Sequence, residues 1–212
     1  MYRAYICLLL ALVVVASCLL QYWGARLLAS LASSRQNRVA IASLSLGALA
    51  LAVFRDNLVV TNWLVLSAAL FAGILLSRQI RSMGALVTFL TVGAIADLIS
   101  TQVGPSRWLA NAAQHANGLA LIHILAVSIR LKGKLVPVIG VSDLMFFTVC
   151  ASTLRGLGWP ETPALLVPLV GILSALGVGL FAGFTPALPF LAAAVILYAY
   201  ASPSTQPDPC RG

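Results

Sequence analysis

Residues 83–101, MGALVTFLTVGAIADLIST, form an apolar stretch of 19 residues that contains one charged side chain, Asp97. A helix needs about 20 apolar residues to cross the hydrocarbon core of a bilayer, so this stretch predicts a membrane-spanning helix. The whole chain agrees, because 61% of its 212 residues are hydrophobic and only 8% are charged. A soluble domain has about 25% charged residues, so the composition excludes a water-soluble globule.

Six other apolar stretches accompany this one. They predict spans at residues 5–23, 39–54, 58–76, 135–153, 164–181 and 186–200. We therefore expect an all-α, polytopic transmembrane helix bundle with about seven spans. The first stretch has some features of a cleaved signal ending at Cys18. It continues to Tyr22 and Trp23, however, and these aromatics suit the headgroup level, so a retained helix is favoured.

Residues 118–129 are apolar but too short to span, and we expect an interfacial or re-entrant helix there. With seven spans, each side of the membrane collects six Lys and Arg residues, which leaves the orientation open. If 118–129 crossed, making eight spans, the tally would be eight against four and would favour an outside N-terminus. The net charge is +8, but the basic residues are scattered singly between apolar runs, so we expect no nucleic-acid binding.

Two acidic residues, Asp97 and Asp143, lie inside expected spans, whereas Asp56, Glu161 and Asp208 lie in loops or in the tail. An acidic side chain at the bilayer centre costs about 3 kcal/mol on insertion scales, so such residues are usually functional. Two carboxyls that meet in an apolar interior cannot both ionise, and they would share one proton. A water between them could then be activated by one carboxyl while the other protonates a peptide carbonyl.

The neighbours of Asp97 on its own helix face are small: Gly93, Ala94, Ser100 and Thr101. Small residues allow another helix to approach closely. The sequence therefore predicts that a second helix packs beside Asp97.

Three short motifs follow one another along the chain. An Asp late in one span is followed 46 residues later by Asp143 of the segment GVSD, and PAL opens the last span. Their order resembles that of the presenilin and signal peptide peptidase family of intramembrane aspartyl proteases, as a compact, prokaryote-like member. That family has Tyr-Asp, Gly-x-Gly-Asp and Pro-Ala-Leu motifs in this order. The pair Asn62-Trp63, and the short spacing of the aspartates, are similar to the signal peptide peptidase branch.

The resemblance covers residues 58–200 and implies a presenilin-like catalytic unit. Residues 1–57 would be additional N-terminal transmembrane helices, and the polar tail 201–212 is expected to be disordered. The implied activity is hydrolysis of transmembrane segments or remnant signal peptides by the dyad Asp97 and Asp143, without cofactor or metal. The substrate-binding residues that it implies are Gly140, Val141, Ser142, Pro186, Ala187 and Leu188.

Two positions depart from the family pattern: Ala96 replaces the tyrosine, and Ser142 replaces the second glycine. Serine can substitute there if the backbone does not need a positive φ. These departures keep open a catalytically degenerate member or a small proton-coupled transporter. A prepilin-peptidase-like enzyme is a third alternative, although Leu144 and its neighbours replace the expected lysine. The expected partners are transmembrane peptide or protein substrates and the lipid bilayer; the oligomeric state and the substrate identity stay open.

Overall fold

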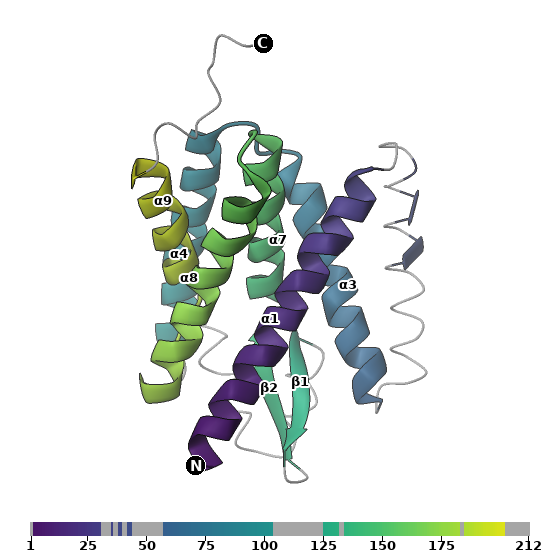
Figure 1. Cartoon of the computed structure of the whole chain (residues 1–212), viewed down its shortest axis with the longest axis vertical. Coiled ribbons are helices and arrows are strands. Elements are labelled where there is room, and N and C mark those ends of the chain that lie inside the picture. Colours follow the sequence, from purple (N-terminus) through teal and green to yellow (C-terminus); the bar gives the residue numbers. More distant parts are fainter. Residues whose placement is uncertain are drawn as a thin grey trace.

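The computed structural model describes residues 2–30, 57–103, 125–131, 134–182 and 185–201, and a few single positions between 35 and 43. In this part of the chain the helices run side by side, and a β-hairpin projects at one end between α4 and α7 in sequence (Figure 1). The elements in chain order are α1 (Tyr2–Ala29), α3 (Leu58–Ser77), α4 (Met83–Val103), β1 (Ala126–Leu131), β2 (Lys134–Gly140), α7 (Val141–Gly156), α8 (Glu161–Ala182) and α9 (Leu188–Ala201).

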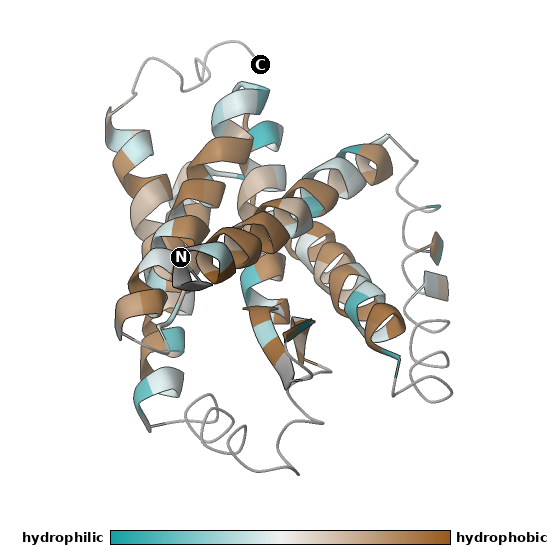
Figure 2. Ribbon diagram, turned by 60° about the horizontal axis from the view of Figure 1, so that its bottom comes forward, coloured by the Kyte–Doolittle hydropathy of each residue, from teal (hydrophilic) through white to brown (hydrophobic). Residues whose placement is uncertain are grey.

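Four of these helices are long and apolar enough to cross a membrane by length and composition. They are α1, α3, α4 and α8, and hydrophobic residues occupy most of their length (Figure 2). The remaining helices, α7 and α9, are shorter, at 16 and 14 residues. The expectation of a helical protein of the membrane type is therefore confirmed at this level. The span expected at 39–54 and the tail from 202 onward lie outside the described residues.

Local signals in the sequence explain where several helices begin and end. Asn57 caps α3, because its Oδ1 accepts hydrogen bonds from the backbone N–H of Val59 at 3.0 Å and of Val60 at 3.4 Å. Ser82 does the same for α4 through the N–H of Ala85 at 3.2 Å. At the end of α7, Gly158 has a φ of 85°, a conformation that glycine adopts without steric cost.

Helix α7 is the centre of the bundle. It packs against α1, α3 and α8, and it has smaller contacts with α4 and α9. Its approach to α3 depends on Gly73, since a Cβ there would lie 2.6 Å from the Cβ of Thr148. Residues of α7 accordingly make up much of the buried core: Leu144, Phe147, Thr148, Val149, Cys150, Ala151, Thr153 and Leu154.

Helix α4 lies at the edge of the described bundle. It packs chiefly against α9 and touches α7. Its outward face exposes large aliphatic side chains to the surroundings, which suits lipid contact: Val92, Ile95, Leu98 and Ile99. On the other side of α9, Gly171 of α8 allows a backbone contact, because a Cβ there would lie 2.6 Å from the Cα of Leu191.

The hairpin corrects two expectations from the sequence. Residues 135–140 were expected to begin a spanning helix, but they form β2, and α7 begins at Val141. The described end of the 118–129 segment forms β1 rather than an interfacial helix. The strands pair antiparallel from Ala126↔Gly140 to Leu131↔Lys134. Proline in a helix interior removes a backbone hydrogen bond and clashes with the preceding turn, so Pro137 and its β-branched neighbours favour a strand.

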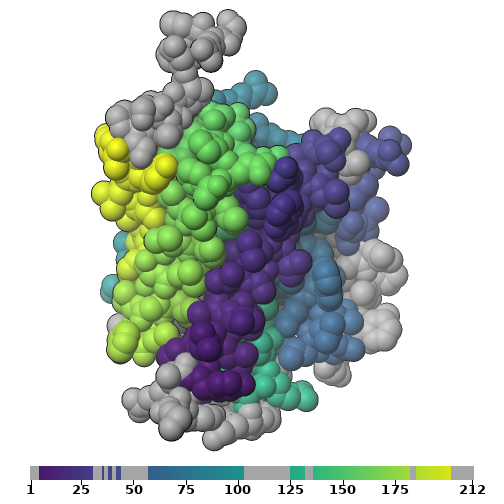
Figure 3. Space-filling model, viewed as in Figure 1, coloured from purple at the N-terminus to yellow at the C-terminus, as the bar shows by residue number. Residues whose placement is uncertain are grey.

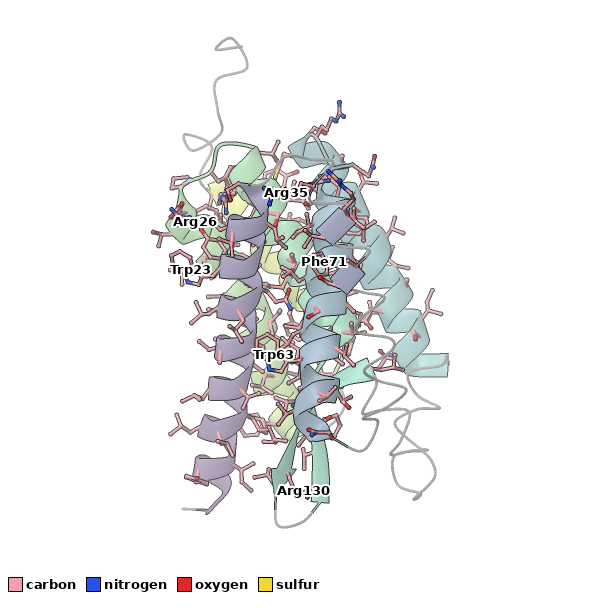
Figure 4. The ribbon with its side chains drawn as sticks, turned by 90° about the vertical axis from the view of Figure 1, so that its right-hand side faces the viewer. Trp23, Arg26, Arg35, Trp63, Phe71 and Arg130 are labelled. Carbon is pink, nitrogen blue, oxygen red and sulfur yellow. The ribbon has the colours of Figure 1, made fainter. Side chains whose placement is uncertain are left out.

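The three labelled arginines lie toward the two ends of the bundle (Figure 4). Arg26 and Arg35 lie at the end opposite the hairpin, and Arg130 lies near the tip of the hairpin (Figure 4). Arg26 also pairs with Glu161 of α8 at 2.8 Å and lies 5.1 Å from the ring centroid of Trp23. These contacts attach α1 to α8, and α1 crosses the face shown in Figure 3 between α8 and α3. The charges therefore flank an apolar middle, as expected for a bundle in a bilayer.

Candidate active site

Asp97 is bound to the first residue of α9. Its Oδ2 accepts a hydrogen bond from the backbone N–H of Leu188 at 3.2 Å, across 91 residues of sequence. The first N–H groups of a helix have no partner within the helix, and a carboxylate at that end also interacts favourably with the helix dipole. Pro189 follows and has no N–H to offer. Asp97 of α4 therefore fixes the position at which α9 begins.

The Pro-Ala-Leu segment lies beside this contact. Residues 185–187 are not helical, and the carbonyl of Ala187 accepts the N–H of Leu191 at 3.1 Å, so Ala187 is the residue preceding the first turn of α9. The sequence predicted a helix from Pro186, but the helix starts at Leu188. The carboxyl of Asp97 and the carbonyl of Ala187 accept hydrogen bonds from N–H groups in its first turn. The side chain of Leu188 is buried, whereas Pro186 and Ala187 are partly exposed.

Asp143 lies in the first turn of α7, immediately after β2. Its Oδ2 accepts a hydrogen bond from the N–H of Gly140 at 3.3 Å, so the carboxyl caps the start of its own helix. Gly140 has a φ of −72°, which any residue can adopt, but a Cβ there would lie 3.1 Å from this same Oδ2. A side chain at residue 140 would therefore crowd the carboxyl of Asp143, whereas the backbone conformation there does not call for glycine.

The two other residues of this motif differ in their surroundings. Val141 is partly buried and packs against the core cluster, whereas Ser142 is exposed. Ser142 belongs to helix α7 and does not have a positive φ. Serine at this position is therefore compatible with the backbone, as the sequence argument required.

The aspartates are brought near one another by a close contact between α4 and α7. Gly93, one turn before Asp97, lies against Phe146, since a Cβ on Gly93 would be 2.7 Å from Cε1 of that ring. The Phe146 ring also stacks on Phe89 of α4, with 5.0 Å between ring centroids. Asp97 lies one turn after Gly93 on α4, and Asp143 lies three residues before Phe146 on α7, so the two aspartates stand on helices that touch at this seam. The small residues expected beside Asp97 thus do accept a neighbouring helix, and that helix contains the second aspartate.

Sequence reasoning missed the residue that holds the hairpin to α3. The side chain of Asn62 donates from Nδ2 to the carbonyl of Ser128 at 2.8 Å and accepts its N–H on Oδ1 at 2.9 Å. Asn62 had been noted only for its resemblance to one branch of a family. The sequence did contain a signal for the hairpin to which Ser128 belongs. The run Val136-Pro137-Val138-Ile139, which forms part of β2, has a composition that favours a strand.

Among the described residues no group of three or more His, Cys, Asp and Glu could hold a metal ion. The two histidines, His115 and His123, lie outside the described part of the chain. The ionisable groups of the described site are the carboxyls of Asp97 and Asp143. No protein-family model, no curated protein and no solved structure was found to match this chain.

Proposed function

We propose that this protein is a multi-pass intramembrane aspartyl protease of presenilin-like fold, with Asp97 and Asp143 as its catalytic dyad. The observation that supports this most directly is the hydrogen bond from the N–H of Leu188 to Oδ2 of Asp97. This bond joins the Asp97 motif to the Pro-Ala-Leu motif. The tight contact of Gly93 with Phe146 packs α4 against α7, the helix that contains Asp143 of the GVSD motif.

The reaction needs one carboxylate and one carboxylic acid. The carboxylate removes a proton from a water molecule, whose oxygen attacks the carbon of the peptide carbonyl, while the acid donates its proton to the carbonyl oxygen. Collapse of the resulting diol breaks the C–N bond, and the leaving amine takes a proton from the dyad. Two nearby carboxyls in apolar surroundings favour this singly protonated state, because both cannot ionise together.

The proposed topology has seven spans, and the direction of the helices around the hairpin supports it. In Figure 1, α4 descends toward the hairpin and α7 rises from it, so the described hairpin does not cross the bundle. Seven spans then comprise α1, the apolar residues 39–54, α3, α4, α7, α8 and α9. In this proposed arrangement the aspartate helices are antiparallel, and we expect Asp97, late in α4, to lie at a similar depth to Asp143, early in α7.

The substrate would be a transmembrane peptide or protein segment. Three residues of the neighbouring motifs have accessible surface: Ser142, Pro186 and Ala187. A substrate segment beside the dyad would contact these residues. The buried side chain of Leu188 contributes differently, by supporting α4 at Gly93, where its Cδ1 lies 3.8 Å from the Cβ position.

The test is cleavage of a model transmembrane peptide in detergent. The native protein should cleave it, and Asp143→Ala should not. Glu161→Gln is the matched control, since it removes an acid at the opposite end of the bundle that pairs with Arg26. Cleavage by Asp143→Ala at the native rate would refute the proposal.

A second candidate is a membrane protein without catalysis, in which Asp97 serves only to cap α9. The hydrogen bond to Leu188 is the observation that favours it, because capping alone would account for an acid at this partly buried position. Asp97→Asn separates the two functions. The amide oxygen can still accept from Leu188, so a capping role survives this substitution, whereas a dyad does not.

A further inference from the structure

Asn62 makes the pair of hydrogen bonds that a neighbouring β-strand would make. Its amide group offers one donor and one acceptor, and both are used by the backbone of Ser128, at 2.8 and 2.9 Å. The N–H and C=O of one residue in a strand point to the same side, so Ser128 directs both groups away from β2. The side chain of Asn62 therefore lies at the outer edge of β1, next to Ser128, which is fully buried.

The position of this contact coincides with an irregularity of the hairpin. Ser128 lies opposite Pro137, which has no N–H, and the register shifts between Val127 and Ser128. The ladder between the strands is interrupted here, as at a β-bulge. The hydrogen bonds between Asn62 and Ser128 tie β1 to α3 at this irregularity of the hairpin.

A short path leads from this contact to the second aspartate. Ala126, two residues before Ser128, pairs with Gly140 of β2. The N–H of Gly140 in turn donates to Oδ2 of Asp143 at 3.3 Å. Helix α3 is packed tightly on α7 at Gly73. The contact of Asn62 therefore links the hairpin, which precedes Asp143, to a helix that is itself held against α7.

We propose that Asn62 is a positioning residue for Asp143, which it places by holding the β1–β2 hairpin in register against α3. This inference rests on the proposed function for its catalytic consequence. Asn62 does not contact the dyad, and its effect is transmitted through the backbone of Ser128 and Gly140.

The first test compares two asparagines of the same helix. Asn62→Ala should lower kcat on the order of 10- to 100-fold with little change in KM, since a misplacement of about 1 Å has such an effect. Asn57→Ala is the matched control: it removes the cap of α3, lowers thermal stability, and should leave kcat unchanged. Native kcat in Asn62→Ala, or an equal loss in Asn57→Ala, would overturn the proposal.

A second test uses rescue by a proton. In Asn62→Asp, a protonated carboxyl has an O–H to donate and a C=O to accept, as the amide has, whereas the ionised carboxylate has no donor. The kcat of Asn62→Asp relative to the native protein should therefore rise as the pH is lowered, while the ratio for Asn62→Ala stays flat. Arg130 is two residues beyond Ser128 on β1 and is the cation with which the new carboxylate of Asn62→Asp would pair. The pH series is therefore repeated in the Arg130→Gln background, in which this ion pair is absent.

A third measurement separates this inference from the proposed function. Amide hydrogen exchange of residues 126–140 needs no activity, and Asn62→Ala should accelerate it while exchange in α8 stays unchanged. If the native protein cleaves nothing, the protease function fails and the exchange experiment still tests the Asn62 contact. Unchanged exchange in the hairpin would overturn the inference even in an active protease.

Discussion

Replacing Gly93 by alanine would place a methyl group 2.7 Å from Cε1 and 2.8 Å from Cζ of Phe146. Ordinary contacts between carbon atoms are about 3.5–4.0 Å, so the ring has to move by about 1 Å. Phe146 cannot simply slide along α4, because it is stacked on Phe89. We therefore expect Gly93→Ala to push α4 away from α7 and to separate the two aspartates.

The expected losses differ between stability and activity. Overpacking a close contact costs about 1–3 kcal/mol, and the better helix propensity of alanine returns about 1 kcal/mol. The net loss of stability is therefore about 0–2 kcal/mol. A displacement of about 1 Å at the reacting groups lowers kcat on the order of 100-fold, equivalent to about 2.7 kcal/mol of activation free energy. Activity should fall more than stability.

The assay is cleavage of a model transmembrane peptide in detergent, together with thermal unfolding of each variant. Gly84→Ala is the matched control in the same helix, because a Cβ at Gly84 meets no atom within 4 Å. The double variant Gly93→Ala/Phe146→Leu should recover part of the activity, since a smaller side chain makes room for the methyl group. Native kcat in Gly93→Ala would refute the idea that the spacing of α4 and α7 sets the dyad.

Four further predictions concern the dyad and the packing of the bundle. Asp97→Asn and Asp143→Asn should each abolish cleavage and leave thermal unfolding near native. The native pH–rate profile should be bell-shaped, with limbs that belong to the pair of carboxyls; a monotonic profile would contradict a shared proton. Gln21→Leu removes two buried hydrogen bonds, to the carbonyl of α3 and the hydroxyl of α7, and should cost about 1–2 kcal/mol of stability in detergent unfolding. Gly171→Ala should destabilise by about 1–3 kcal/mol because the opposing atoms are backbone, whereas Gly177→Ala, with nothing within 4 Å, should not.

The long apolar helices were predictable because their signal is local. A run of about 20 apolar residues satisfies all its backbone groups only as a helix when it lies in lipid. The bounds of α3, α4 and α8 accordingly lie close to the runs at 58–76, 83–101 and 164–181. The apolar run at 5–23 lies within α1, which continues past Trp23 to Ala29.

The hairpin was not predicted, because hydrophobicity alone cannot separate a strand from part of a helix. Residues 135–140 are as apolar as the helix that follows them, and the run was assigned to one span. Pro137 and the β-branched residues beside it were the evidence for a strand. Here the local preference of the backbone decided the structure rather than the length of the apolar run.

The site was predictable in its members but not in its contacts. The order of the motifs pointed to Asp97, Asp143 and Leu188, yet nothing in the sequence indicated that the N–H of Leu188 would be held by Asp97, 91 residues away. The contact of Asn62 with Ser128 spans 66 residues and uses backbone groups of a strand that was not expected. Such contacts depend on the packing of complete helices.

The polar side chains of α1 determine when this helix can be secured during biosynthesis. Gln21 is almost fully buried, and its amide is satisfied by the carbonyl of Leu66 and the hydroxyl of Thr148. Arg26 finds its carboxylate only at Glu161. Chains are synthesised from the N-terminus, so α1 enters the membrane long before α7 and α8 leave the ribosome. Helix α1 is made before α3, α7 and α8 but is secured in the bundle only after them, and a nascent chain that stops short of α8 exposes an unsatisfied α1 to the machinery of membrane-protein quality control.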